Sequence, residues 1–124
     1  MFGPRKGVLP KQLLQELMTR EFIKDVDASL LNPASIDLPL SEEAYKIPCV
    51  FQLGKGEHVR TVLEVVGKEP HDLEKPLEVG ETYIIRIAGT WNLPQNVYAY
   101  ANPKSTAGRV NLFARVMADN VEMY

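Results

Sequence analysis

Cysteine and long hydrophobic runs are what this sequence most clearly lacks. Cys49 is the only cysteine, so an intrachain disulfide is impossible, which fits a reducing compartment. No apolar run approaches the ~20 residues needed to span a bilayer. The opening segment MFGPRKGVLP has no apolar core of the kind that a signal peptide needs. We therefore expect a cytoplasmic protein with no membrane partner.

An excess of basic charge is also missing. The formal net charge is −2, which gives no basic field for nonspecific binding, so we expect no nucleic-acid partner. Hydrophobic residues make up 45% and charged residues 24% of the chain, the balance of a folded globular protein. The 124 residues suffice for one domain with its own core. We expect a single domain over 1–124, and an incomplete one, because the final ADNVEMY carries no turn or capping signal.

Several motifs of catalysis and cofactor binding are absent. The soft or imidazole metal ligands are Cys49, His58 and His71, and no CxxC, HxxxH or HxE pattern gathers them. The segment PCVF begins at Pro48, but Gln52 stands where a zinc deaminase has its second cysteine. No G-x-S-x-G elbow, P-loop or G-x-G-x-x-G is present. We expect no metal site, zinc included, and no serine triad.

The periodicity of the apolar residues changes once along the chain. Near the amino terminus they recur at helical spacing, which predicts one helix over about 9–23. After it, period-two alternation and β-branched residues predict strands in SIDLPL, VRTVLEVVG, TYIIRIAGT and RVNLFARVM. A β region over about 35–124 follows, separated by Gly- and Pro-rich turns. The pattern predicts a mainly β, antiparallel, barrel- or sandwich-like domain with one amino-terminal helix.

The segment PKSTAGR places cations and hydroxyls together near the end of the chain. Lys104 supplies a point charge, Arg109 a planar fork that suits phosphate, and Ser105 a hydroxyl that can cap the following turn. Such a bend can seat an anion. The residues alone equally allow a polar hairpin turn that leads into the last strand.

Asp37 and the aromatic residues allow two interpretations each. Asp37 could orient a catalytic group, although a strand-edge carboxylate that accepts local N–H bonds is commoner. Trp91 and the tyrosines Tyr83, Tyr98 and Tyr100 could stack on a base. Interior or barrel-rim positions are commoner for such aromatic side chains.

Three segments in order give the chain a specific resemblance. GVLPKQLLQELM, then NPASIDLPL, then ANPKSTAGRVNLFARVMAD resemble the dCTP deaminase family of the dUTPase-like β-clip superfamily, and its long bacterial type in particular. The middle of the chain, Glu42 to Asn96, resembles the family only in its general pattern of residue types and carries no specific motif. The resemblance implies a β-clip, a distorted barrel with one amino-terminal helix. It also implies a homo-oligomer, a trimer or pseudo-trimer, with nucleotide sites between neighbouring units.

The resemblance also implies the chemistry of the PKSTAGR segment. Lys104, Ser105 and Thr106 would hold the triphosphate of a deoxynucleotide, with Mg²⁺ carried as its counter-ion. Arg109 would lie close to the reacting base and its water. The candidate catalytic residues are Arg109 and Ser105, the serine that would also hold the triphosphate. The implied reaction is zinc-independent hydrolysis of dCTP to dUTP and ammonia.

The general base of that reaction is the part that the resemblance does not supply. In the family a glutamate on a later strand plays this role, and Asp119 and Glu122 come too early to match it. Two alternatives therefore stay open. One is a dUTP diphosphatase, although such proteins generally lack an arginine at the position of Arg109. The other is a non-catalytic β-clip remnant or assembly module.

Overall fold

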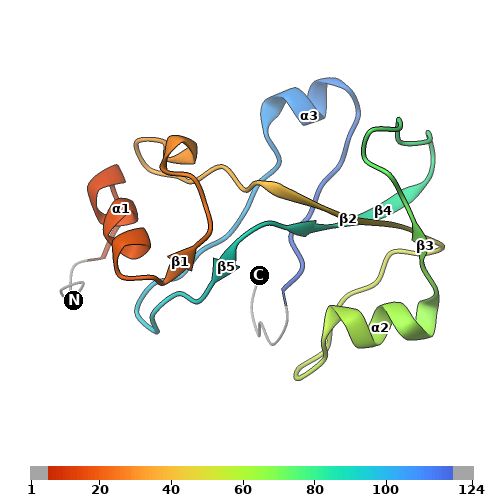
Figure 1. Cartoon of the computed structure of the whole chain (residues 1–124), viewed down its shortest axis with the longest axis horizontal. Coiled ribbons are helices and arrows are strands. Elements are labelled where there is room, and N and C mark those ends of the chain that lie inside the picture. The colour runs from red at the N-terminus through yellow and green to blue at the C-terminus, as the bar shows by residue number, and fades with distance from the viewer. Residues whose placement is uncertain (1–5, 119–124) are drawn as a thin grey trace. The chain divides into compact units, whose positions relative to one another are not determined.

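The structure is a computed structural model that describes residues 6–118. Two β-sheets organise the described chain, one with strand order β1-β5 and one with order β3-β2-β4 (Figure 1). The mainly β fold is confirmed, but the described strands do not close into a barrel. The elements in chain order are α1 (Lys11–Thr19), β1 (Ile23–Lys24), η1 (Ala28–Leu30), β2 (Leu40–Ile47), α2 (Val59–Val66), β3 (Glu69–Pro70), β4 (Thr82–Ile87), β5 (Thr90–Trp91) and α3 (Ser105–Arg109).

The chain divides into two compact units. The first consists of Met1–Glu43 and Ile85–Tyr98, and the second of Ala44–Ile84 and Ala99–Tyr124. The family resemblance predicts one β domain, so it did not predict this division. The long strands β2 and β4 each contribute residues to both units.

The core of the first unit forms where α1 meets the small β1-β5 sheet. The sheet pairs antiparallel, with Ile23 opposite Trp91 and Lys24 opposite Thr90. The apolar residues of α1 recur at three- and four-residue spacing, so they share the face that turns to the core. Apolar side chains from α1, β5 and the loops pack around a buried set made up of Leu14, Leu17, Ile23 and Leu31.

Helix α1 is shorter than the predicted 9–23, because the chain leaves the helix at Glu21. Glu21 has a φ of 61°, in the left-handed region. Its N–H donates to Met18 O at 3.0 Å, and Phe22 N–H donates to Leu17 O at 2.9 Å. This pair of bonds is a Schellman motif, which satisfies the last carbonyls of the helix. It also turns Phe22 back onto the core against which it packs.

The second unit contains the end of β2, β3, α2 and the start of β4. β2 and β3 pair antiparallel, with Tyr45 opposite Pro70 and Lys46 opposite Glu69. Among the described residues of this unit, the buried apolar side chains are Ala44 and Ile47 on β2 and Leu63 on α2.

Helix α2 is a correction to the prediction from sequence, which made VRTVLEVVG a strand and allowed one helix only. Val59, Val62, Leu63 and Val66 recur at helical spacing, and Leu63 is buried. β-branched residues lower helix propensity by tenths of a kcal/mol each, which this periodic apolar face overrides. Gly67, with a φ of 88°, ends the helix.

The last part of the chain differs from the prediction as well. RVNLFARVM was predicted as a strand, but residues 112–118 carry no regular structure, and α3 stands before them. The segment SIDLPL forms only an isolated bridge, between Leu31 and Ile36, before β2 begins at Leu40. The strand predicted in TYIIRIAGT is confirmed as β4.

Candidate functional site

The PKSTAGR segment folds into the short helix α3 of the second unit. Lys104 is its N-cap, with extended backbone, and its carbonyl accepts from Ala107 N–H at 3.0 Å. No side chain caps the start of the helix. The alternative of a polar hairpin turn that leads into a strand is therefore wrong, since residues 110–118 form neither a hairpin nor a strand.

A second Schellman motif ends α3. Asn111 has a φ of 56°, and its N–H donates to Gly108 O at 3.1 Å. Leu112 N–H donates to Ala107 O at 2.9 Å, which completes the motif. Asparagine tolerates the left-handed conformation better than most residues, so Asn111 is the sequence signal that marks the end of this helix.

The predicted site residues lie on the surface of this helix. Ser105 and Arg109 stand four positions apart, so they share one face of α3, and Lys104 directly precedes them. Ser105, Thr106 and Arg109 are exposed. The hydroxyls and the guanidinium donors are therefore available to a ligand.

The charge of this segment is of one sign. Lys104, Arg109 and Arg115 are cations, and no acidic residue occurs from Ala99 to Ala118. No carboxylate within this stretch of sequence therefore competes with a bound anion for these cations. Asp119 and Glu122, which the sequence ruled out as the general base, lie outside the described residues.

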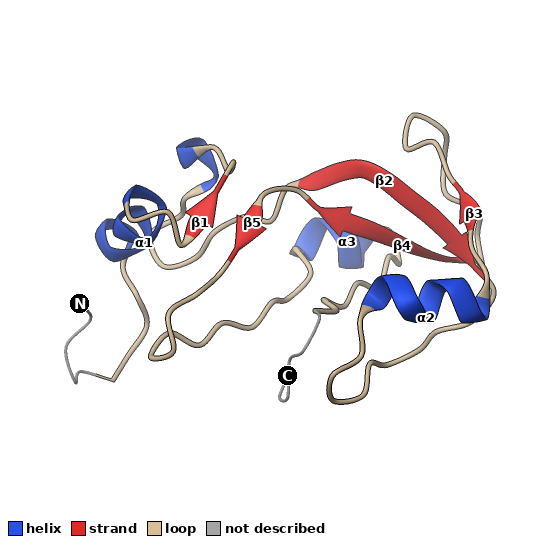
Figure 2. Cartoon of the chain, turned by 60° about the horizontal axis from the view of Figure 1, so that its bottom comes forward, coloured by secondary structure: helices blue, strands red, loops and turns tan. Residues whose placement is uncertain are grey.

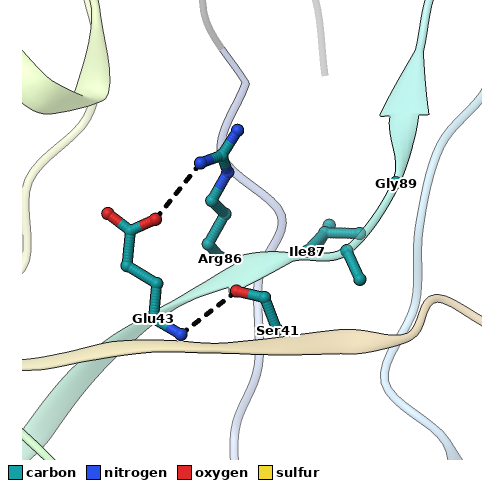
Figure 3. A pocket seen from close by; sticks show the side chains of 6 residues that line it. Ser41, Glu43, Arg86, Ile87 and Gly89 are labelled. Carbon is teal, nitrogen blue, oxygen red and sulfur yellow. Dashed lines mark hydrogen bonds and ion pairs between the residues drawn. The ribbon is translucent and has the colours of Figure 1, made fainter. Parts of the chain in front are cut away.

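A hollow in the first unit is a feature that sequence reasoning missed. It has a volume of about 340 Å³ and is lined by side chains from β2, from β4 and from the turn after β4 (Figure 3). Arg86 Nη1 lies 3.2 Å from Glu43 Oε2 across the two strands, and Ser41 Oγ accepts from Glu43 N–H at 3.2 Å. Each partner of this ion pair is more than a quarter exposed, so water screens the pair.

A polar cluster in the second unit anchors the loop between β3 and β4. Lys46 Nζ lies 3.1 Å from Glu78 Oε2 and 3.5 Å from Glu81 Oε1. The hydrogen bond to Glu78 is the main cause that raises the pKa of Lys46 above its usual value. Glu78 N–H also donates to Tyr83 Oη at 3.0 Å, so a side chain of β4 contributes to anchoring the loop.

The candidate metal ligands stay separate. His71 stacks edge-on against Tyr83 with ring centroids 4.8 Å apart, and its Nε2 is shielded from solvent without a hydrogen-bond partner. Cys49 is exposed. Within residues 6–118 no three His, Cys, Asp or Glu side chains come together in a geometry that could hold a metal ion.

Asp37 takes the local role that was the commoner of its two interpretations. Its Oδ1 accepts from Asn32 Nδ2 at 2.9 Å, and its N–H donates to Leu30 O at 3.0 Å, so it braces the turn of the NPASIDL segment. Trp91 packs against the core and donates from Nε1 to Ala88 O at 3.0 Å. Tyr98 and Tyr100 are exposed.

No helix within residues 6–118 has the length and apolar content that a bilayer crossing needs.

Comparison with known proteins identifies the family. Residues 5–124 match the family model described as 2′-deoxycytidine 5′-triphosphate deaminase (DCD) N-terminal domain. The chain belongs to this family. The resemblance carried by the three sequence segments is therefore confirmed, and the chain is a dCTP deaminase-like domain.

A solved structure supports the same assignment. The crystal structure of 2′-deoxycytidine 5′-triphosphate deaminase from Agrobacterium tumefaciens matches 94% of this chain with a TM-score of 0.85 and 34% sequence identity. The chain spans about a third of the length of that protein, 35% of it. No curated protein matches the chain. The dCTP deaminase-like fold is therefore shared along nearly all of this chain, while most of the length of that protein lies outside the match.

Proposed function

We propose that this dCTP deaminase-like domain binds the triphosphate of dCTP, with its Mg²⁺, through Lys104, Ser105, Thr106 and Arg109. The observation that carries the proposal is the joint exposure of Ser105, Thr106 and Arg109 on a segment without acidic residues. The match to the amino-terminal domain of 2′-deoxycytidine 5′-triphosphate deaminase supports the choice of nucleotide. Phosphate oxygens accept hydrogen bonds strongly, and a guanidinium donates two in parallel.

Each side chain has a distinct task in this binding. Lys104 provides a flexible point charge for one phosphate, and the hydroxyls of Ser105 and Thr106 donate to its oxygens. Arg109 stands one helical turn from Ser105, so its fork reaches past the triphosphate tail toward the sugar and the base. In that place it orients the base and the water that attacks it, which is the position that the family resemblance gives to Arg109.

The reaction of the complete enzyme is hydrolytic deamination of dCTP to dUTP and ammonia. A carboxylate must reach the attacking water, directly or through one further water, to act as general base. No carboxylate lies on the segment from Ala99 to Ala118. In the proposed reaction this base therefore comes from a residue outside that segment.

The test is a titration of the chain with Mg²⁺ and one of three ligands: dCTP, dUTP or inorganic tripolyphosphate. Binding of all three, with dCTP tightest, supports a triphosphate site with a preference for cytosine. A preference for dUTP with release of pyrophosphate would identify a dUTP diphosphatase instead. Binding without ammonia release by the chain would agree with a base supplied from elsewhere. No binding of any of the three would refute the proposed site.

A further inference from the structure

We draw no further inference here: the strongest candidate, the open hollow of the first unit on strands β2 and β4 (Figure 2), lined in part by the side chains of Glu43 and Arg86 (Figure 3), carries nothing, because these two charged groups already pair with each other and nothing in the structure shows what covers the hollow.

Discussion

Replacement of Gly89 by alanine gives a sharp test of how the first unit is packed. Gly89 lies in the turn between β4 and β5, with a φ of 82°. A Cβ at this position would stand 2.5 Å from Val26 Cγ2 and 2.8 Å from the carbonyl oxygen of Lys24. The carbonyl is backbone next to the β1-β5 pairing, so it cannot move without loss of that pairing. Gly89→Ala should therefore destabilise the first unit in two ways, through the left-handed backbone conformation and through the steric clash of the added Cβ.

The two causes have different magnitudes. A side chain in the left-handed region costs about 1–2 kcal/mol, and overpacking of a tight site costs about 1–3 kcal/mol. Gly89→Ala should therefore lower the free energy of unfolding by about 2–5 kcal/mol. Urea unfolding followed by circular dichroism measures this loss, as a midpoint lower by roughly 1–2.5 M for an m-value of about 2 kcal/mol/M.

Gly80 is the matched control for this experiment. It has the same φ of 82°, but a Cβ there would meet nothing within 4 Å. Gly80→Ala should therefore show the backbone cost alone, about 1–2 kcal/mol. Equal losses for the two variants would refute the steric part of the reasoning. No loss for either would refute the assigned backbone conformation as well.

Three further predictions concern helices and caps. Leu17, 2% exposed, anchors α1 in the core, so Leu17→Ala should cost about 2–5 kcal/mol in urea unfolding, while Val8→Ala at the surface should change little. Glu21→Gly should stabilise the chain by about 0.5–1 kcal/mol by relief of the left-handed strain, and Glu21→Ala should not. The hydrogen bond from Ser29 N–H lowers the pKa of the Asp27 carboxyl, so the contribution of this bond to stability is present above pH 3.8 and is lost as the pH falls further. Asp27→Asn should therefore flatten the acid limb of a curve of stability against pH.

The elements that sequence predicted best are those with an unmixed signal. α1 carries the helical spacing that its packing uses, and β4 is rich in β-branched and aromatic residues, so the predicted and observed elements agree apart from the ends of α1 and the last three residues of TYIIRIAGT. α2 was missed because four of its residues are valine, and their β propensity outweighed the helical spacing in the prediction. In physical terms the spacing decides, since burial of Leu63 depends on the face and not on the propensity.

The sequence shows which side chains the candidate site contains, but it does not show the structure around them. Lys104, Ser105 and Arg109 identified a segment suited to an anion, whereas the alternation after Arg109 predicted a strand. The left-handed turn at Asn111 removes that strand, and a local pattern of period two cannot reveal such a turn. The contact of Arg86 with Glu43 was beyond sequence reasoning for another reason. It joins residues 43 positions apart, so it depends on strand pairing.

The binding of triphosphate by the α3 segment is tested most directly by the thermal shift that dCTP and Mg²⁺ produce in matched variants. At a ligand concentration of a hundred times Kd the unsubstituted chain should gain about 2.7 kcal/mol. Arg109→Ala and Lys104→Ala should each lose most of this gain, because each removes a charged donor to the nucleotide. Arg115→Ala, which removes a cation of the same segment outside α3, should keep it. An equal shift in Arg109→Ala and Arg115→Ala would contradict the assigned site.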